Sequence, residues 1–489
     1  MPSTKIVCTI GPASQSEAVL ERLILAGMNV ARLNFSHGTP AEHAEVIARI
    51  RALATKLGQP IAILQDLQGP KIRTGVLRDH QPVHLTSGAS FTLTTQSLVG
   101  DALRVSTTYQ HLPNDVKPGA HVFLADGLLE LEVIETTETE VHCRVLHGGV
   151  LGEHKGINLP GVVVSAAALT KKDLADLHFG IAQGVDFVAV SFVRQASDIQ
   201  AARIAIADAV TLPVSKTSDA IKHASASQEP QKQPSIIAKL EKPEAITHLD
   251  AILEVSDGVM VARGDLGVEL SPEKVPLAQK RIIDRANEFG LPVITATQML
   301  ESMITQPRPT RAEVSDVANA ILDGTDAIML SEETANGLYP VEAVEMMARI
   351  ARETEPACRP KTQHTRRQRP TLAHAVSSAA HILAKEAAAE AIVVFTRSGR
   401  SGRLISKERP DVPIIAYTSS DAIYRQLALW WGIIPRMIPL MDSTEALITE
   451  VSSRLAQDGL VQAGEKVVIM GGMPIAAEAR TNFIKLHQV

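Results

Sequence analysis

Short apolar runs rich in β-branched residues alternate with longer stretches of mixed polarity along most of the chain. In the longer stretches, such as Ser16–Ala26 and Pro40–Leu57, the apolar residues recur at helical spacing. Strands that alternate with helices favour parallel β/α units, and eight such strands favour a closed barrel. The eight predicted strands are Lys5–Ile10, Asn29–Asn34, Ile61–Asp66, Phe187–Phe192, Ile236–Leu240, Gly258–Ala262, Val293–Thr297 and Ala327–Leu330.

One connection departs from this alternation. From about Gly75 to Gly156 the chain is rich in Val, Thr, Leu and Gly and shows no convincing helical pattern. We predict an all-β domain, of β-barrel type, inserted after the third barrel strand. An insertion at this point lies over the end of the barrel where active sites form, so we expect it to act as a lid.

The last part of the chain predicts a third domain. Prolines and serines interrupt Leu212–Pro234, which predicts an exposed loop, and the basic stretch Arg359–Arg369 predicts a linker. Beyond the linker, strands and helices alternate again, as expected for an open α/β domain. The predicted fold class is therefore α/β, with a TIM (β/α)8 barrel over 1–74 and 157–350, a lid domain over 75–156 and a C-terminal α/β regulatory domain over 351–489. The third domain's predicted strands are Ala391–Phe395, Ile414–Tyr417 and Lys466–Met470.

Composition excludes several classes of function. The 489-residue chain has a net charge of −6, which gives no basic footprint for nucleic acid, and only 3% aromatic residues. Its three cysteines are far apart and lack metal-ligand spacing, which fits a reducing compartment. No apolar run approaches the ~18 residues of a membrane span. We expect a cytoplasmic protein with neither nucleic-acid nor membrane partners.

Charged residues gather where the predicted barrel strands end. Lys239 and Glu241 are two residues apart and share one face of the fifth strand. Asp265 follows the sixth strand between two glycines, which allow close approach of a ligand. Two carboxylates on adjacent strand ends suit Mg²⁺, which takes its other ligands from water and phosphate. Taken alone, the Lys239–Glu241 pair equally fits a simple ion pair.

Neighbouring strand ends add cations and hydroxyls to this predicted metal site. Arg32 ends the second strand, Lys71 and Arg73 follow the third, and Thr297 and Ser331 follow the seventh and eighth. Arginine suits the flat geometry of phosphate and carboxylate groups. The combination predicts a site for an anionic substrate and a divalent cation, and hence phosphoryl transfer, which depends on positioning and charge neutralisation.

Four segments together resemble the pyruvate kinase family, and the resemblance extends over essentially the whole chain. They are Asn34–Gly38, Gly69–Gly75, Ala262–Gly267 and Ala296–Ser302. It implies a bacterial-type enzyme of glycolysis that transfers the phosphoryl group of phosphoenolpyruvate to ADP, giving pyruvate and ATP. It also implies a homotetramer.

The resemblance further implies roles for individual residues. Glu241 and Asp265 would hold Mg²⁺ or Mn²⁺, and Lys239 would stabilise the phosphoryl group in flight. Arg32 would contact that group, and Thr297 and Ser331 would relay a proton to the enolate. The substrate carboxylate would be held by the Thr297 hydroxyl and by the backbone from Ala262 through Gly264 to Asp265. Asn34, His37 and Arg73 would lie beside the nucleotide phosphates.

Two regions concern regulation and cations. Many family members bind K⁺ through residues that match Asn34, Ser36, Asp66 and the backbone of Leu67. Lys71 resembles the K⁺-independent branch, and we expect its ammonium to replace K⁺; an ion pair between Lys71 and a surface carboxylate is the alternative. In the C-terminal domain, a loop after a strand resembles the family's effector site for a phosphorylated metabolite. That loop consists of Thr396, Arg397, Ser398, Gly399, Arg400 and Ser401.

Two other functions remain open from the sequence. The chain fits a Mg²⁺-dependent barrel aldolase or lyase that acts on phosphoenolpyruvate or pyruvate, although the inserted lid and Arg73 favour a nucleotide. It also fits a non-catalytic metabolite sensor, against which the intact set of Arg32, Lys239, Glu241 and Asp265 argues.

Overall fold

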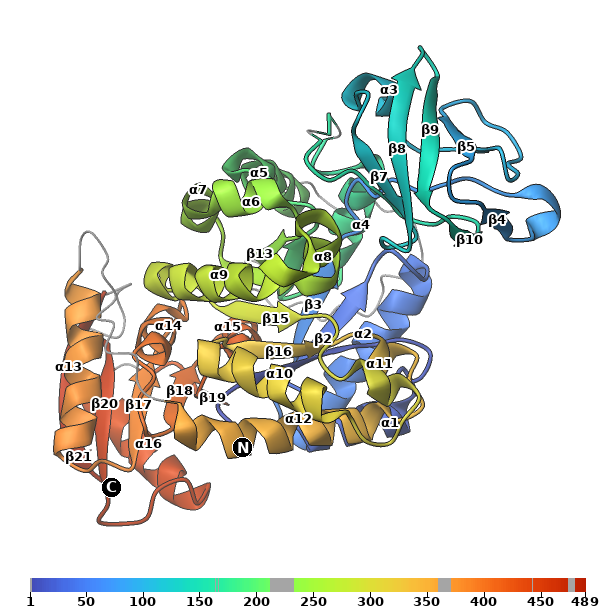
Figure 1. Ribbon diagram of the computed structural model, residues 1–489. Coiled ribbons are helices and arrows are strands. Elements are labelled where there is room, and N and C mark those ends of the chain that lie inside the picture. Colours follow the sequence, from blue (N-terminus) through green and yellow to red (C-terminus); the bar gives the residue numbers. More distant parts are fainter. Residues whose placement is uncertain are drawn as a thin grey trace.

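The structure is a computed structural model that describes residues 2–162, 164–165, 167–211, 233–358, 371–441, 443–473 and 480–489. Nearly all of the predicted loop Leu212–Pro234 and the whole predicted linker Arg359–Arg369 lie outside these residues. A barrel forms the centre of the molecule, an all-β region projects from one end, and an α/β region lies at the other (Figure 1). None of the described helices is both long and apolar enough to cross a membrane.

Eight parallel strands close into the predicted barrel, in the order β1-β16-β15-β14-β13-β12-β3-β2. Each is buried along most of its length because helices cover its outer face, which is why it reads as a continuous apolar run. The predicted fold class is confirmed. The strands are β1 Lys5–Thr9, β2 Val30–Asn34, β3 Ala62–Asp66, β12 Phe187–Val190, β13 Ser235–Leu240, β14 Gly258–Ala262, β15 Val293–Ala296 and β16 Ala327–Leu330.

The barrel helices begin and end at residues that local chemistry favours. The Ser16 hydroxyl accepts a hydrogen bond from Val19 N at the start of α1, and Thr39 forms a capping box with Glu42 in α2. Gly58 ends α2 in the left-handed conformation. The helices are α1 Glu17–Ala26, α2 Pro40–Leu57, α4 Lys171–Ala182, α5 Ala196–Thr211, α6 Pro243–Thr247, α7 Leu249–Val255, α8 Arg263–Leu270, α9 Val275–Phe289, α10 Arg311–Asp323, α11 Glu332–Ala335 and α12 Pro340–Thr354.

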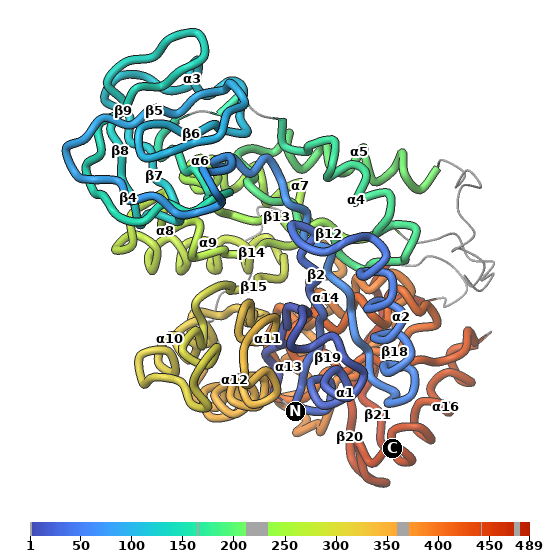
Figure 2. The backbone as a smooth tube through the Cα atoms, turned by 90° about the vertical axis from the view of Figure 1, so that its right-hand side faces the viewer, coloured from blue at the N-terminus to red at the C-terminus, as the bar shows by residue number. Residues whose placement is uncertain are grey.

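The inserted segment has its own core and stands apart from the barrel (Figures 1 and 2). Its strands pair as a six-stranded sheet, β11-β7-β8-β9-β5-β6, and a two-stranded sheet, β10-β4, rather than as one closed ring. The helix-free prediction was wrong at α3, Leu112–Asp115, because a single turn is too short to show a period. The strands are β4 Val83–Leu85, β5 Ser90–Thr94, β6 Arg104–Ser106, β7 His121–Leu124, β8 Leu129–Thr136, β9 Glu140–His147, β10 Gly149–Leu151 and β11 Ile157–Asn158.

The C-terminal region is an open five-stranded sheet in the order β19-β18-β17-β20-β21, with β21 antiparallel. The sequence pattern missed β19 and β21, since Pro435 interrupts β19 and β21 is a partly exposed edge strand. The strands are β17 Ala391–Phe395, β18 Ile414–Thr418, β19 Ile433–Met437, β20 Lys466–Gly472 and β21 Thr481–Gln488, and the helices are α13 Leu372–Glu386, α14 Arg400–Lys407, α15 Asp421–Gln426 and α16 Thr444–Gln457.

Two buried aspartates join the C-terminal region to the barrel, each just before a barrel strand. Asp186 precedes β12 and binds Arg425 at 2.8 Å. Asp326 precedes β16 and binds Lys407 of α14 at 2.6 Å. Ala428 and Leu429 join the apolar cluster inside the barrel. The C-terminal region therefore covers the amino ends of the strands and leaves their carboxyl ends to the lid.

Lys5 should make this contact dependent on pH. Its ammonium donates to Ile433 O at 2.7 Å, and burial lowers the pKa of Lys5 from 10.5 to about 8, although Glu355 partly opposes the effect. The unfolded chain binds this proton more tightly than the folded chain. The free energy of unfolding should therefore rise by up to roughly 3 kcal/mol as the pH increases from about 8 to about 10.5. Urea unfolding across this range should show a larger rise for the wild type than for Lys5→Met, and equal rises would contradict the prediction.

Candidate active site

A buried charge cluster lies where the barrel strands end, centred on Lys239 of β13. The Lys239 ammonium is 3.1 Å from Asp66 Oδ1, 2.9 Å from Glu241 Oε1 and 2.8 Å from Ser191 Oγ. Burial alone would lower the pKa of Lys239, but Asp66 and Glu241 raise it well above its ordinary value. The lysine is therefore a fixed cation, suited to stabilising negative charge rather than to accepting a proton.

Arg32 of β2 supplies a second cation beside Lys239. Its Nε donates to Asp66 Oδ2 at 2.7 Å and its Nη1 to Thr9 Oγ1 at 2.8 Å. Burial would raise the pKa of Asp66, but Lys239 and Arg32 hold it below its ordinary value. Asp66 thus fixes both cations in place, and each retains donors that the carboxylate does not use.

Glu241 and Asp265 provide the acidic side of the cluster. Glu241 is 1% exposed, and its Oε2 accepts a hydrogen bond from Phe192 N at 2.6 Å. Burial raises the pKa of Glu241, and the charge of nearby Asp265 raises it further, while Lys239 opposes both. Among the described residues no group of three or more acidic, His or Cys side chains could hold a metal. Two carboxylates that repel each other fit a divalent cation that takes its remaining ligands from water and phosphate.

A strained turn at the end of β15 carries Thr297. Thr297 and Gln298 have φ of 65° and 51°, which is unfavourable for a β-branched residue. The Thr297 hydroxyl accepts a hydrogen bond from Gly264 N at 2.8 Å, in the first turn of α8. Ser331 Oγ, after β16, is buried without a hydrogen-bond partner among the described residues. Strained backbone and an unpaired buried hydroxyl are typical of sites that complete their contacts with a ligand.

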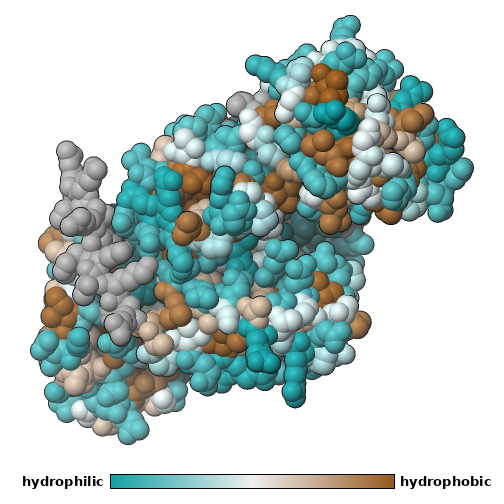
Figure 3. All heavy atoms as spheres, in the orientation of Figure 1, coloured by the Kyte–Doolittle hydropathy of each residue, from teal (hydrophilic) through white to brown (hydrophobic). Residues whose placement is uncertain are grey.

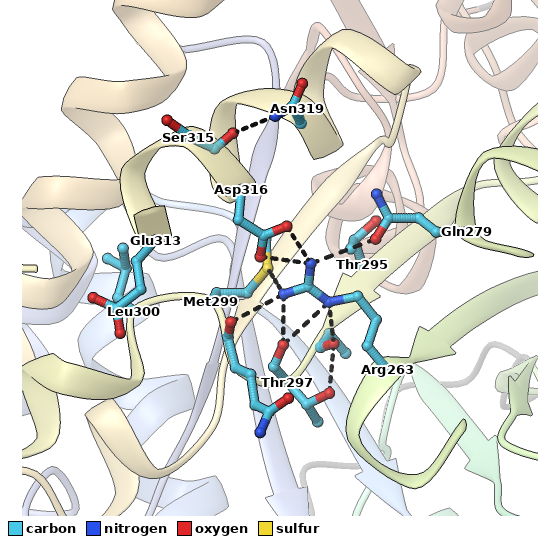
Figure 4. A network of polar contacts seen from close by, with 12 residues as sticks. Arg263, Gln279, Thr295, Thr297, Met299, Leu300, Glu313, Ser315, Asp316 and Asn319 are labelled. Carbon is cyan, nitrogen blue, oxygen red and sulfur yellow. Dashed lines mark hydrogen bonds and ion pairs between the residues drawn. The ribbon is translucent and has the colours of Figure 1, made fainter. Parts of the chain in front are cut away.

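The Arg263 side chain holds this turn in place (Figure 4). The guanidinium donates to Thr297 O at 2.7 Å and to Gln298 O at 3.1 Å, and it pairs with Asp316 of α10 at 2.6 Å. The carboxylate of Glu333 connects the segments that follow β15 and β16, because it accepts hydrogen bonds from Leu300 N and Ser331 N. These contacts fix the positions of Thr297 and Ser331 relative to α8.

His37, predicted to lie beside a nucleotide, lies within electrostatic reach of Arg32 and Arg73. Burial lowers the pKa of His37, and the charges of Arg73, Lys71 and Arg32 lower it further. Arg73 lies at the entry to the lid, where its Nη1 donates to His154 O at 2.8 Å. The exposed Glu332 raises the pKa of His37, so it lies within electrostatic reach of the same group.

The region predicted for a monovalent cation is already hydrogen-bonded. Asn34 Oδ1 accepts from Ser36 N at 3.1 Å, and Leu67 O accepts from Ser191 Oγ at 2.7 Å. Lys71 forms no ion pair with any described residue and lines a small cavity of 40 Å³ with Asp265. The structure thus places Lys71 near the cluster but not in contact with Asp66.

The predicted effector loop lies far from this cluster, in the C-terminal region. Thr396 follows β17, Gly399 has a φ of 83° and precedes α14, and Ser401 Oγ is 2.7 Å from Thr481 Oγ1. The structure does not bring Thr396, Arg397, Ser398, Gly399, Arg400 or Ser401 to the carboxyl end of the barrel.

Ser191, Arg263 and Glu333 are site residues whose side chains the sequence did not single out. Ser191 follows β12, so its position after a barrel strand was a usable signal. Gly69 packs directly against it, because a Cβ at Gly69 would lie 2.9 Å from Ser191 Cβ. For Arg263, the resemblance implies a role only for the backbone, since the sequence does not reveal that the side chain turns towards Thr297.

The surface between barrel and lid is visibly hollowed (Figure 3). A cavity of 730 Å³ between them lies beside α8 rather than over Lys239, and it is lined by His121 and Asp126 of the lid and by Gly264 and Gln298 of the barrel. This volume is in the range of small-molecule sites. The lid therefore covers the end of the barrel that carries the charge cluster.

Comparisons with known proteins agree along the whole chain. The family "Pyruvate kinase, barrel domain" matches residues 1–344, and "Pyruvate kinase, alpha/beta domain" matches residues 374–487. The chain is 45% identical over 491 residues to a pyruvate kinase of Geobacillus stearothermophilus, covering 99% of this chain and 80% of that protein. It is 46% identical over 489 residues to pyruvate kinase 2 of a Synechocystis species, covering 99% and 79%. The crystal structure of a pyruvate kinase from Cryptosporidium parvum superposes with a TM-score of 0.91 at 36% identity, covering 100% of this chain and 96% of that one.

Proposed function

The chain belongs to the pyruvate kinase family, and from that premise we propose that it transfers the phosphoryl group of phosphoenolpyruvate to ADP at the cluster around Lys239. The observation that carries the proposal is the Lys239 ammonium, held between Asp66, Ser191 and Glu241 with Arg32 beside it. A phosphoryl group in flight carries charge on its oxygens, and fixed cations in a water-poor site stabilise that charge.

The substrate carboxylate would lie at the first turn of α8. The Thr297 hydroxyl accepts a hydrogen bond from Gly264 N at 2.8 Å, which holds it beside the first turn of α8, and the backbone N–H of Asp265 in that turn would also meet the carboxylate. Ser331 Oγ has no hydrogen-bond partner in the part of the chain that the structure describes, and it would donate to, or order water beside, the enolate that forms when the phosphoryl group leaves. Thr297 and Ser331 together would deliver the proton that converts the enolate to pyruvate.

We propose that Glu241 and Asp265 hold Mg²⁺ or Mn²⁺. When bound, the cation neutralises phosphoryl charge and orients the substrate oxygens. Burial and the charge of Asp265 raise the pKa of Glu241, and Lys239 offsets them only in part, which supports a further cation at this carboxylate. His37, Arg73 and Asn34 would contact the phosphates of the nucleotide from the side of the lid.

One assay distinguishes this activity from the alternatives. Purified protein with phosphoenolpyruvate, ADP and Mg²⁺ should produce ATP and pyruvate in equal amounts. Carbon–carbon bond formation or cleavage without ATP formation would indicate an aldolase or lyase. Binding of phosphoenolpyruvate without turnover would indicate a sensor.

Arg263 should govern substrate affinity through the turn that carries Thr297. Arg263→Lys keeps a cation near Asp316 but cannot donate to several carbonyl oxygens at once. We expect kcat/KM for phosphoenolpyruvate to fall by about 10–100-fold, mainly through KM, because misplaced contacts reduce binding of the carboxylate. Steady-state kinetics measure the effect, and Lys56→Met, which breaks the exposed Lys56–Glu21 ion pair between α2 and α1, is the control. An unchanged KM in Arg263→Lys would contradict the prediction.

We also propose that Lys71 replaces the K⁺ ion used by many members of the family. Lys71 has no ion-pair partner among the described residues, and its charge reaches His37. Wild-type activity should change little when K⁺ is added to a buffer free of K⁺ and Na⁺. Lys71→Glu should lose roughly ten-fold or more without K⁺ and recover with it, since one close charge is worth about 1–4 kcal/mol. Lys155→Glu, at the other side of the lid entry, should not acquire a K⁺ requirement. Strong K⁺ activation of the wild type would contradict the proposal.

Regulation and assembly follow as further parts of the proposal. The loop from Thr396 to Ser401 would bind a phosphorylated metabolite that activates the enzyme, supported by the open turn at Gly399 before α14. Arg397→Ala should then shift the activation curve of a phosphorylated sugar without changing activity at saturating substrate.

We propose a homotetramer and the division into a barrel over 1–74 and 157–350, a lid over 75–156 and a regulatory region over 351–489. Light scattering tests the homotetramer, and limited proteolysis tests the division into domains.

A further inference from the structure

Helix α8 is the part of the barrel that the inserted lid touches, and it lies next to β7 of the lid in both views (Figures 1 and 2). Its first turn carries Asp265, and its last turn carries Val268 and Glu269. A Cβ on Gly127, in the turn between β7 and β8, would lie 3.7 Å from Val268 Cγ1. Asn158 Nδ2, in β11, donates a hydrogen bond to Glu269 Oε1 at 3.0 Å. Residues four apart share one face of a helix, so the lid contact and the proposed metal ligand Asp265 are one turn apart on α8.

Glu269 joins the lid to the barrel through a single carboxylate oxygen. Its Oε1 accepts from Asn158 of the lid sheet and also lies 2.6 Å from the Lys242 ammonium. Lys242 directly follows Glu241 at the end of β13. The Glu269 side chain is only 1% exposed, and its Oε2 has no hydrogen-bond partner among the described residues. Such a carboxylate depends strongly on each partner that it has, because losing one leaves a charge that water does not reach.

Asn158 lies where the chain returns from the lid to the barrel. Its strand, β11, pairs with β7 of the lid, and Ile157 N donates to Ile72 O at 2.9 Å. Arg73 and Gly156 form an antiparallel bridge in the same place. The two segments that connect lid and barrel are therefore hydrogen-bonded to each other. A movement of β11 away from α8 would displace Arg73, which is predicted to lie beside the nucleotide phosphates.

We propose that Glu269 is a positioning residue, which holds the lid on α8 and so sets the distance between the nucleotide and the charge cluster. The hydrogen bond from Asn158 fixes the lid strand, and the ion pair with Lys242 fixes the carboxylate to the barrel. This role rests on the proposed transfer of a phosphoryl group to ADP. The proposed place of the substrate carboxylate, at the first turn of α8, belongs to the barrel alone. Loss of the contact should therefore impair ADP more than phosphoenolpyruvate.

Asn158→Asp tests the contact, because it places a second carboxylate against the buried Glu269. We expect KM for ADP to rise by about ten-fold or more, and KM for phosphoenolpyruvate to change by less than about three-fold. Glu269→Gln should raise KM for ADP less, since its amide oxygen still accepts from Asn158, and it adds no charge that would endanger folding. The double variant Asn158→Asp/Glu269→Gln exchanges donor and acceptor at the same net charge. It should bring KM for ADP back to within about three-fold of the wild type, as expected for two residues in direct contact.

Asn114→Asp is the matched control, because it adds the same charge at an exposed position of the lid helix α3. It should leave both KM values unchanged. Equal rises of both KM values in Asn158→Asp, or a double variant no better than that single variant, would mean that Glu269 only stabilises the fold.

Hydrogen exchange of the full-length protein measures the lid contact without turnover. Amides of residues 72–75 and 155–158 should exchange faster in Asn158→Asp and return to the wild-type rate in the double variant. If this pattern appears in a protein that forms no ATP, the proposed function fails and the lid contact stands. If ATP is formed but neither exchange nor KM for ADP responds to Asn158→Asp, the role of Glu269 is overturned and the proposed function stands.

Discussion

Lys239→Met should lower kcat for phosphoryl transfer by about 10³-fold or more, because the substitution removes the cation that faces the transferring group. Asp66, Ser191 and Glu241 hold the Lys239 ammonium in a fixed position, so no other flexible side chain can take over its place. The loss should appear in kcat, measured by ATP formation from phosphoenolpyruvate and ADP. Retention of more than about a tenth of the wild-type kcat would be too much for a group that acts in the transition state.

The same substitution should also destabilise the fold. Asp66 keeps Arg32 as its partner, but Glu241 loses its cation while remaining 1% exposed. Breaking a buried ion pair from one side typically costs about 3–5 kcal/mol. Urea unfolding of Lys239→Met beside Lys280→Met separates the two effects. The control loses an ion pair between a half-exposed lysine of α9 and Asp323 of α10, away from the charge cluster, so it should retain its activity.

Glu241→Gln should impair metal binding and lower kcat by about 10²–10³-fold, comparable to losing one preorganised contact to the transition state. The amide still accepts the hydrogen bond from Phe192 N, but its NH₂ group would face the Lys239 ammonium. It has neither the charge nor the oxygen pair that a hard divalent cation prefers. Titration with Mn²⁺, followed by calorimetry, measures the loss of metal affinity independently of activity.

Glu269→Gln is the matched control for this metal experiment. Glu269 is also buried, and it binds Lys242 at 2.6 Å and Asn158 at 3.0 Å beside the same cleft. Its loss should leave Mn²⁺ affinity close to that of the wild type, even if movement of the lid changes turnover. Equal losses of Mn²⁺ affinity in both variants would mean that general acidity, rather than Glu241, attracts the metal.

The barrel was predictable because each of its strands is buried on both faces. Such strands read as continuous β-branched runs, as at Ala62–Asp66 and Gly258–Ala262, and the predicted bounds of the barrel strands differ from the structure by at most two residues. The edge strand Thr481–Gln488 escaped prediction because it is only partly buried. The single turn Leu112–Asp115 escaped because it has no period to detect.

For the candidate site, too, some features could be predicted from the sequence and others could not. Parallel strands bring their carboxyl ends to one edge, so the sequence alone determined that Arg32, Lys239, Glu241 and Asp265 meet at one end of a barrel. It could not determine that Lys239 reaches past β12 to Asp66 on β3, since that contact depends on how the closed ring staggers its strands. Nor could it determine that Arg263 turns towards a strained Thr297. The order of the strands and the chemical type of each residue follow from the local sequence. The direction of each side chain, to within a few ångströms, depends instead on barrel closure and on packing between distant segments.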